Sequence, residues 1–261
     1  MINNIETIAS KYRMISDMHT HSVYSHGFHY NHGKGTILEN VQAAVACGLS
    51  EIAITDHGPG HMFYGLDQKR LPEMRRDIEY AMRLNPGIKV YLGVEANIID
   101  TADALDVTAE HFSEYDIVLA GYHYGLPKGN MGANILSNIK SVKGGAPSGS
   151  AAALMLRNTD MVIRALHHND IMTLTHPGDK GPFDMAELAR ACEETNTLME
   201  INTRHKHLTV EEIRIAMEYD VKFIIDSDAH KPSEVGNFAE GIRRALEAGL
   251  EIERIVNIAS R

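Results

Sequence analysis

Histidines and carboxylates recur along this sequence at the ends of short apolar runs. In chain order the motifs are Asp17-Met-His19-Thr-His21, Thr55-Asp56-His57-Gly58, Gly93-Val-Glu95, Gly121-Tyr-His123, Thr175-His176-Pro177, Glu200-Ile-Asn202 and Asp226-Ser-Asp228-Ala-His230. Imidazole and carboxylate groups bind transition metals and transfer protons near neutral pH. The chain holds 15 histidines but only two cysteines. Neither cysteine belongs to these motifs, so the mixture favours zinc, manganese or iron.

The apolar runs and the stretches between them predict alternating strands and helices. Strands are expected at 14–18, 51–55, 89–95, 117–122, 171–175, 198–202 and 222–226, and helices at 38–46, 70–84, 159–168, 185–195, 210–219 and 233–248. Thr209 with Glu212 has the spacing of a helix capping box, and Asp184 with Glu187 is a looser variant. Such repeated units form either a closed barrel or an open doubly wound sheet. No Gly-x-Gly-x-x-Gly follows the first strand, which counts against the dinucleotide-binding form of the open sheet.

A barrel would bring the strand-end motifs together. The carboxyl ends of all its strands open on one face, where the active sites of this architecture lie. Side chains two residues apart in a strand point the same way, so His19 with His21 and Asp228 with His230 can each face one cavity. A single strand-end histidine is usually structural, but seven motifs at the same relative position indicate a shared site. They offer more ligands than one metal needs, which predicts two or more metals with Glu95 placed to bridge them.

The size and charge of the chain narrow its class. Its 261 residues are 44% hydrophobic and 23% charged, which is ordinary for a soluble globular protein, and α/β barrels of about 250 residues are single domains. We therefore expect one domain over 1–261, with a flexible insertion at the Gly-, Ser- and Lys-rich stretch 128–150. A net charge of −10 without a basic stripe argues against a nucleic-acid partner.

The sequence also predicts where the protein resides. No apolar run approaches the length of about 20 residues that a membrane span needs. The chain does not begin with a basic segment followed by an apolar one, as a secretory leader would. The sparse cysteines, Cys47 and Cys192, fit a reducing compartment. We therefore expect a cytoplasmic protein without a membrane partner. Its oligomeric state stays open, a homo-oligomer included.

At these residues the sequence resembles the polymerase-and-histidinol-phosphatase (PHP) family of metal-dependent phosphoesterases. The motifs that carry the resemblance run from Asp17 to His230 in family order: Asp-x-His-x-His-Ser, Ile-Thr-Asp-His-Gly, Gly-Val-Glu-Ala-Asn, Gly-Tyr-His, Thr-His-Pro-Gly, Glu-Ile-Asn and Ser-Asp-Ala-His. The chain looks most like the stand-alone phosphatase branch of small bacterial hydrolases. The resemblance implies a distorted seven-stranded (β/α)7 TIM-like barrel with a trinuclear centre of divalent zinc, manganese or iron.

The resemblance also implies a ligand set. Its members are His19, His21, Glu95 and Asp228 for one metal, Glu95, His123 and His176 for a second, and His57 and His230 with one further residue for a third. In the family that further residue is an Asp or His five or six positions beyond the second histidine of the first motif. His26 stands at this spacing and is expected to be the ligand, with His29 as the alternative and His32 nearby.

The function that follows from the resemblance is hydrolysis of a phosphate monoester of a small molecule. A hydroxide bridging two metals is expected to attack phosphorus, with Glu95 and Asp228 holding the metals that activate it. Arg204, at the mouth of the expected barrel, could bind the substrate phosphate, although a surface arginine is an equal reading. His205 is expected to line the same mouth. A metal-bound water, Asp17 or His205 could protonate the leaving group, and the sequence does not choose among them.

Three other functions stay open. Amidohydrolases also begin with a His-x-His motif, but they typically add a bridging lysine and a single aspartate at the last strand, where this chain has Asp-x-His. PHP domains also serve DNA polymerases, so a nuclease is an alternative, against which the acidic charge argues. A metal-binding module without catalysis is the third. The substrate itself is not named by the sequence.

Overall fold

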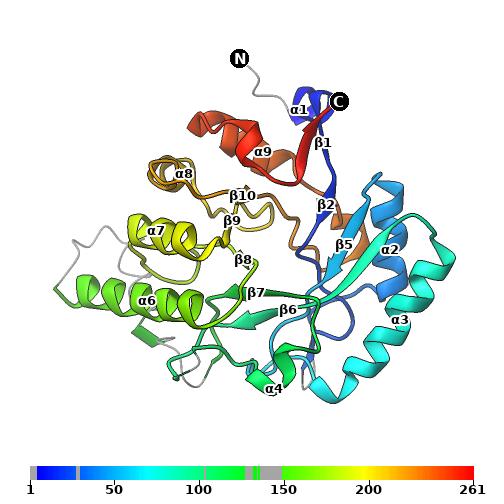
Figure 1. Ribbon diagram of the computed structural model, residues 1–261, viewed down its shortest axis with the longest axis horizontal. Helices are drawn as coiled ribbons and strands as arrows, with labels where there is room; N and C mark the ends of the chain where they lie inside the picture. Colours follow the sequence, from blue (N-terminus) through cyan, green and yellow to red (C-terminus); the bar gives the residue numbers. More distant parts are fainter. Residues whose placement is uncertain (1–4, 28–29, 103, 127–131, 134, 136–148) are drawn as a thin grey trace.

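A computed structural model describes residues 5–27, 30–102, 104–126, 132–133, 135 and 149–261. Its centre is a seven-stranded parallel sheet with the strand order β10-β9-β8-β7-β6-β5-β2. The sheet curls on itself, and the helices lie around its outside, with α2 and α3 on one flank and α6 and α7 on the other (Figure 1). This is the distorted TIM-like barrel that the sequence predicts.

The elements alternate along the chain as expected. The strands are β1 (Tyr12–Met14), β2 (Ser16–Asp17), β3 (His26–Gly27), β4 (Tyr30–Asn31), β5 (Glu51–Ile54), β6 (Lys89–Asn97), β7 (Ile117–Gly121), β8 (Thr173–Leu174), β9 (Leu198–Glu200), β10 (Phe223–Ile224) and β11 (Ile258–Ser260). The α-helices are α1 (Ile5–Lys11), α2 (Ile37–Ala46), α3 (Leu71–Leu84), α4 (Ala109–Phe112), α6 (Gly149–His168), α7 (Met185–Thr195), α8 (Val210–Ala216) and α9 (Ala239–Ala248). Short 3₁₀ helices are η1 (Gln68–Arg70), η2 (Pro232–Glu234) and η3 (Ile252–Arg254).

The two edge strands of the curled sheet, β2 and β10, are joined near their carboxyl ends. A parallel bridge links Thr20 to Ala229. Deeper in the seam the Asn257 side chain replaces ladder hydrogen bonds: its Nδ2 donates to Ser16 O (2.8 Å) and Ile225 O (2.6 Å), and its Oδ1 accepts from Ile225 N (3.0 Å). The buried Asn257 amide, together with Asp226 Oδ1, which accepts from Met18 N (2.7 Å), therefore joins the two edges where regular pairing stops.

Local signals fix several of the helices. The capping box predicted at Thr209 and Glu212 is present at the start of α8, and a second one, Thr36 with Glu39, begins α2. Asp184 caps α7 by accepting from the backbone of Ala186 and Glu187. Apolar faces of the helices pack on a continuous core that includes the fully buried Ile52, Leu92 and Phe223.

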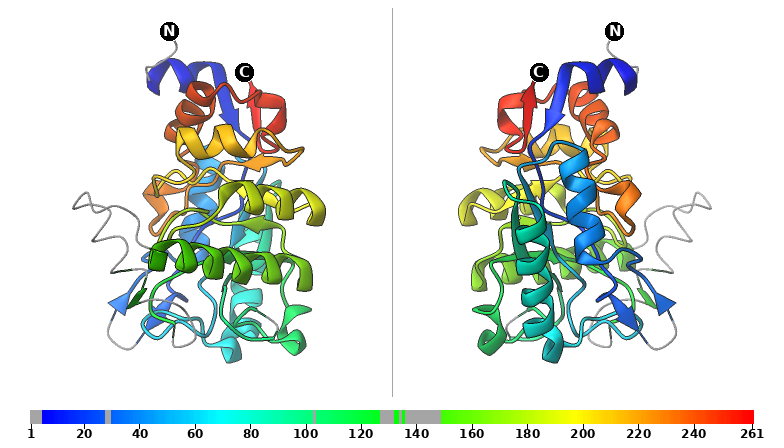
Figure 2. Two further views of the ribbon diagram at one scale, coloured as in Figure 1. Left: turned by 90° about the vertical axis from the view of Figure 1, so that its left-hand side faces the viewer. Right: turned by 90° about the vertical axis from the view of Figure 1, so that its right-hand side faces the viewer.

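Some predicted boundaries were wrong. The strand expected at 14–18 is two strands, because β1 turns away to pair antiparallel with β11, and α1 and β11 lie at the same end of the molecule (Figure 2). The helix expected at 159–168 begins ten residues earlier, at Gly149. The helix expected at 233–248 is η2 and α9, separated at Gly236 (φ 76°).

The predicted insertion at 128–150 lies mostly outside the described residues, so it stays a prediction, as does the assignment of the chain to a single domain. Within the ranges that the structure describes, no helix combines the length and the apolar character required to cross a bilayer.

Candidate metal centre

The strand-end residues meet at one end of the barrel. His19 and His21 follow β2, His57 follows β5, Glu95 lies in β6, His123 follows β7, His176 follows β8, and Asp228 and His230 follow β10. All eight side chains are buried. A bridge between His57 and Glu95 extends the ladder to this end of the sheet. The structure thus brings together eight of the nine metal ligands predicted from the sequence; the ninth is His26.

Glu95 lies at the centre of the group. Its Oε1 is 2.9 Å from His176 Nε2, 3.2 Å from His123 Nε2 and 3.4 Å from His19 Nε2. Its Oε2 is 2.9 Å from His57 Nδ1. Burial raises the pKa of this carboxyl, but the surrounding histidines outweigh it and hold the pKa well below its usual value. With His21 Nε2 at 3.8 Å from Oε2, one carboxylate anion faces five imidazoles, an arrangement suited to a ligand that two metals share.

Asp228 organises the other side of the group. Its Oδ1 is 3.2 Å from His21 Nε2 and 3.7 Å from His19 Nε2. Burial raises the pKa of Asp228, and the neighbouring histidines, His19 first, hold it well below its usual value. The backbone φ is 52° at Asp228 and 29° at His176. Few residues other than glycine adopt positive φ angles, and such strain concentrates at functional sites.

Several buried atoms of the group form no hydrogen bond of acceptable geometry with any described residue, although His57 Nδ1 and Glu95 Oε2 are 2.9 Å apart. The atoms are both ring nitrogens of His57, Nε2 of His123, Oε2 of Glu95 and Oδ1 of Asp228. Buried polar atoms are nearly always hydrogen-bonded, so these atoms call for another partner. Four sets of donor atoms lie within 4.8 Å of one another: His21, His57 and His230; His19, His21 and Glu95; His57, Glu95 and His123; and His176, His205 and Asp228. Imidazole and carboxylate donors so grouped fit divalent metals of the zinc, manganese or iron type.

Among the side chains described between His21 and α2, His32 is the histidine that reaches the group. Its Nε2 is 2.6 Å from His230 Nε2, and its ring centroid is 5.1 Å from that of His57. Burial and the nearby His21 lower the pKa of His32 to about 3, so the ring is neutral at pH 7 and able to bind a metal. The side chain of His26 and the whole of His29 lie outside the described part of the chain. The expectation for His26 therefore stays a prediction.

Partners on the far nitrogen orient these rings. Glu200 Oε1 is 2.7 Å from His19 Nδ1, and Asn97 Oδ1 is 2.8 Å from His123 Nδ1. The Asn97 amide is itself fixed, because its Nδ2 donates to Asp106 Oδ2 at 2.5 Å. Its oxygen must then accept from Nδ1–H of His123, which leaves the Nε2 lone pair facing Glu95. Sequence reasoning missed Asp106, since it follows no strand and belongs to no motif.

Asp17 and Asp56 form hydrogen bonds to loop residues and not to the described histidine rings. Asp17 accepts from Ser227 N (3.1 Å), Ser227 Oγ (2.6 Å) and Gly236 N (2.9 Å), which ties β2 to the loop after β10. Asp56 accepts from the backbone and hydroxyl groups of Ser22 and Ser25. The Asp17 side chain is fully buried. These contacts give Asp17 a part in positioning the strand ends, and none of its hydrogen bonds turns it toward a substrate.

The two predicted substrate residues lie at the edge of the group. His205 Nε2 is 3.2 Å from Asp228 Oδ2, and its Nδ1 is 3.0 Å from Asp179 Oδ2. Burial lowers the pKa of His205, but the bonds to Asp179 and Asp228 outweigh it and raise the pKa to about 9. Arg204 is more exposed and its Nη1 is 3.3 Å from Glu234 Oε2. Lys180 Nζ, 2.5 Å from Asp179 Oδ2, adds a second cation to this edge. The sequence reasoning missed both Asp179 and Lys180.

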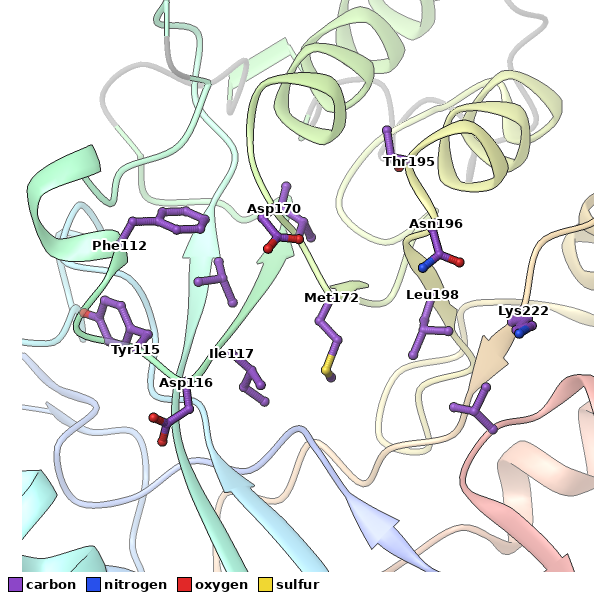
Figure 3. Close-up of a pocket in the computed structure, with 13 residues that line it drawn as sticks. Phe112, Tyr115, Asp116, Ile117, Asp170, Met172, Thr195, Asn196, Leu198 and Lys222 are labelled. Atoms are coloured by element: carbon purple, nitrogen blue, oxygen red, sulfur yellow. The ribbon is translucent and has the colours of Figure 1, made fainter.

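A cavity of about 660 Å³ lies at the other end of the barrel, before the strands β7 to β10 begin. Asp116, Asp170, Asn196 and Lys222 line it together with apolar side chains such as Met172 (Figure 3). None of its lining residues belongs to the histidine group. We therefore assign the chemistry to the carboxyl ends of the strands, in agreement with the general rule for barrels.

Comparisons with known proteins agree with this geometry. Residues 17–207 match the PHP domain. A "Probable phosphatase" of Caldanaerobacter subterraneus subsp. tengcongensis is 30% identical over 261 residues, covering 95% of this chain and 88% of the relative. Another, from Acetivibrio thermocellus, is 26% identical over 94% of this chain and 91% of its own.

Among solved structures, histidinol phosphate phosphatase from Lactococcus lactis, complexed with zinc, L-histidinol and phosphate, shares the fold with a TM-score of 0.60. Its sequence is 17% identical, and the match covers 91% of this chain and 95% of that one. The matched domain spans most of the chain, from Asp17 before the first histidine motif to His207 beyond Glu200. This chain is a member of the PHP domain family.

Proposed function

We propose that this protein is a metal-dependent phosphatase that hydrolyses a phosphate monoester of a small molecule at a trinuclear centre. The observation that carries the proposal is the set of buried imidazole and carboxylate atoms that converge on Glu95 and form no hydrogen bond of acceptable geometry among the described residues. When bound there, divalent zinc, manganese or iron would supply a bridging hydroxide as the nucleophile and positive charge to stabilise the transition state. The names of the curated relatives and the zinc and phosphate in the L. lactis structure support this reading.

The protein side chains would hold the metals in three groups. We assign Glu95 to the bridge between the first two, with His19, His21 and Asp228 on one side and His123 and His176 on the other. His57 and His230 serve the third. His32 supports this third set as the donor closest to His230, while His26 remains the candidate drawn from the family spacing.

Two cations at the edge of the group suit the phosphate. Arg204 can turn its guanidinium from Glu234 to phosphate oxygens, since a bidentate guanidinium–phosphate pair is stronger than an exposed salt bridge. Lys180 offers a second positive charge. Both would neutralise oxygens that face away from the metals, which orients the ester with its leaving group toward the mouth.

The proton for the leaving alkoxide is best supplied from His205 Nε2. This ring is 27% exposed, whereas the Asp17 carboxylate is fully buried and engaged with Ser227 and Gly236. Asp179 holds the far nitrogen of His205 at 3.0 Å. His205 can therefore face both the centre and the solvent, as a proton donor to a departing group must.

The test pairs metal analysis with phosphate release on the same preparation. Protein purified without chelator should carry three equivalents of zinc, manganese or iron and release phosphate from a panel that includes histidinol phosphate and simple alkyl and aryl phosphates. Asp228→Ala should lose metal and at least about 100-fold in kcat/KM. Asp160→Ala, on the exposed face of α6, is the matched control. Full metal content and activity in Asp228→Ala would refute the proposal.

A further inference from the structure

An aromatic stack stands beside the metal centre and has no part in the proposed chemistry so far. The Tyr64 ring lies between two imidazoles: its centroid is 3.6 Å from that of His61 at an interplanar angle of 20°, and 3.9 Å from that of His32 at 9°. It is also 4.7 Å from the ring of His57. A series of aromatic rings thus extends from His57, a predicted metal ligand, to the segment His61–Tyr64. We call this segment the aromatic lip.

The lip exposes large apolar side chains at its outer end. Phe63 is 57% exposed and Met62 is 51% exposed. Phe63 is the one exposed phenylalanine among the described residues, and these two form the one pair of adjacent exposed large hydrophobics there. Burying a side chain of this size is worth about 1.5–3 kcal/mol, so a ligand that covered this pair would gain binding free energy.

Backbone contacts hold the lip in place. Met62 N donates to Gly125 O (3.3 Å), Gly65 N to His61 O (3.1 Å) and Leu66 N to His57 O (3.0 Å). Gly125 adopts a φ of 86°, and a Cβ there would lie 2.9 Å from His61 Nε2 and 3.5 Å from Phe63 Cδ2. The lip therefore packs directly on the backbone that follows His123, and its exposure belongs to an ordered loop at the edge of the centre.

The edge of the centre is chemically divided. Arg204 and Lys180 contribute charge at the loops after β9 and β8, whereas the lip, at the loop after β5, contributes Met62, Phe63 and Tyr64. A phosphate monoester is divided in the same way, with a dianion at one end and the organic leaving group at the other. With its phosphate on the metals and cations, its organic part must lie over another portion of the mouth, and the lip is the portion that offers an apolar surface.

We propose that the aromatic lip binds the leaving group, and that the preferred substrates are phosphate monoesters of arylmethyl or aryl alcohols. The flat face of Phe63 would stack on the substrate ring, while Tyr64, whose two faces are covered by His61 and His32, would hold the lip beside the centre. This inference rests on the proposed phosphatase function for the nature of the ester. Aromatic stacking together with apolar burial should favour such an ester by about tenfold over an alkyl ester of similar reactivity.

A binding experiment tests the lip without turnover. The chain contains no tryptophan, so Phe63→Trp preserves a flat apolar side chain and introduces a single tryptophan at the lip, which can be excited at wavelengths where the tyrosines do not absorb. Zinc-loaded Phe63→Trp is titrated with benzylphosphonate and with ethylphosphonate, which cannot be hydrolysed. We expect a blue shift or quenching of the tryptophan emission with benzylphosphonate and an affinity about tenfold higher than for ethylphosphonate. Equal affinities, or no change in emission at saturation, would overturn the proposal.

A kinetic experiment measures the preference directly. Benzyl phosphate and ethyl phosphate have leaving groups of similar acidity, so the ratio of their kcat/KM values reports recognition. Phe63→Ala should lower this ratio about tenfold, and Tyr80→Ala, which removes an exposed tyrosine from α3, should leave it unchanged. Metal content is measured for each variant. An unchanged ratio in Phe63→Ala with normal metal content would overturn the proposal.

The two experiments separate failure of the lip from failure of the proposed function. If wild-type protein hydrolyses both esters without preference, the proposal that the lip binds the leaving group is wrong and the phosphatase proposal stands. If the protein hydrolyses neither ester but binds benzylphosphonate more tightly than ethylphosphonate, the phosphatase proposal is wrong and the lip proposal stands. If the lip instead covers a second copy of the chain, Phe63→Ala would change the mass measured by light scattering and leave benzylphosphonate affinity unaltered, which would overturn the proposal.

Discussion

Three histidines of the centre form a hydrogen bond to the protein through one ring nitrogen, and their other ring nitrogen faces the proposed metal site. Glu200 holds His19, Asn97 holds His123, and the Asp228 carbonyl is 2.8 Å from Nδ1 of His230. The anchor selects the tautomer, because a donor on one nitrogen leaves a lone pair on the other. The protein alone thus orients the rings before any ion arrives. Burial lowers the pKa of His19, but Glu95, Glu200 and Asp228 outweigh it and raise the pKa well above its usual value, so this ring must release a proton when a metal binds. This arrangement makes the anchors as testable as the ligands.

Asn97→Ala should weaken metal binding without removing a ligand. The substitution leaves His123 free to rotate and to change tautomer, and loss of such partners typically costs about 10–100-fold in metal affinity. Competition with a chromogenic chelator measures the affinity. Asn237→Ala, at an exposed asparagine, is the control. Wild-type affinity in Asn97→Ala would show that the Asp106–Asn97–His123 series does not position the ring.

His61 should make the metal-free protein sensitive to acid. Burial, with a smaller effect of His123, lowers the pKa of His61 from 6.5 to about 4. Between these values the unfolded chain binds a proton that the folded chain does not, so the stability contributed by His61 is complete above pH 6.5 and is lost as pH falls toward 4. The loss is at most about 1.4 kcal/mol per pH unit.

Urea unfolding of chelator-treated wild type and His61→Gln measures this contribution. The difference in free energy of unfolding between the two proteins should be constant above pH 7 and should shrink as pH falls from 6.5 to 4. The plateau above pH 7 is the internal control for any loss of packing in the variant. A difference that does not depend on pH would mean that His61 titrates alike in both states.

Spacing in the sequence predicted the histidines and carboxylates of strand ends, because strand geometry repeats and fixes where such residues lie. His32, Asp106 and Asp179 could not be predicted in this way. They come from irregular loops, whose path depends on tertiary contacts such as the hydrogen bond that the Gly60 amide donates to Asp106 Oδ2 (2.7 Å). Residue type alone does not distinguish such a loop aspartate from a solvated one.

At the scale of elements, the loop after β9 is held from the outside by α9. Arg244 is buried, and its guanidinium donates to the carbonyls of Leu208 (2.7 Å) and Asn202. Within the loop, Asn202 Oδ1 accepts from the backbone of Arg204 (2.9 Å) and His205 (2.7 Å). Burying a cation costs free energy. Here the buried guanidinium holds both ends of the loop that carries the proposed substrate residues Arg204 and His205.

Arg244→Met should loosen this loop. Two buried carbonyls lose their donor, which predicts a loss of about 1–3 kcal/mol in the free energy of unfolding. Because Arg204 and His205 would no longer be held at the mouth, KM for a phosphate ester should rise several-fold, while metal content stays normal. Arg243→Met is the matched control, since Arg243 forms ion pairs with Glu240 and Glu247 at the surface. Equal KM values in the two variants would contradict the positioning role.

Elements with regular apolar periodicity were predicted well, as α3 and α7 show. The errors fell where tertiary contacts override local pattern. Ile15 breaks the first strand because its amide donates to Asn257 O (2.8 Å), which directs β1 toward β11. Gly236 interrupts the helix expected at 233–248 because its amide is taken by Asp17 at 2.9 Å. Neither partner is close in sequence, so no local signal identifies it.

At the scale of the whole molecule, the metal ligands come from strand ends all around the curled sheet. The described residues of β2 and β10 form no regular ladder: one bridge, the Asn257 side chain, and the Asp17 and Asp226 carboxylates, which accept from Ser227 N and Met18 N, join the two sides of the seam. His19 and His21 lie on one side of that seam, and Asp228 lies on the other, 3.2 Å from His21 Nε2. Metals held between these residues would therefore fasten the seam as well as serve catalysis.

Removal of metal should lower the melting temperature of the whole protein. A ligand that binds only the folded state, at 1,000 times its dissociation constant, adds about 4 kcal/mol to the free energy of unfolding. For a domain of this size, each kcal/mol shifts the melting temperature by about 2–4 °C, so chelation should lower it by roughly 8–16 °C. Differential scanning calorimetry of metal-loaded and chelated protein measures the shift, and restoring zinc should reverse it.

Asp228→Ala should show a much smaller shift, because it removes the ligand that joins the two sides of the seam. An equal shift in Asp228→Ala would place the stabilising metals elsewhere, and no shift in the wild type would mean that the barrel is closed fully by its own side chains.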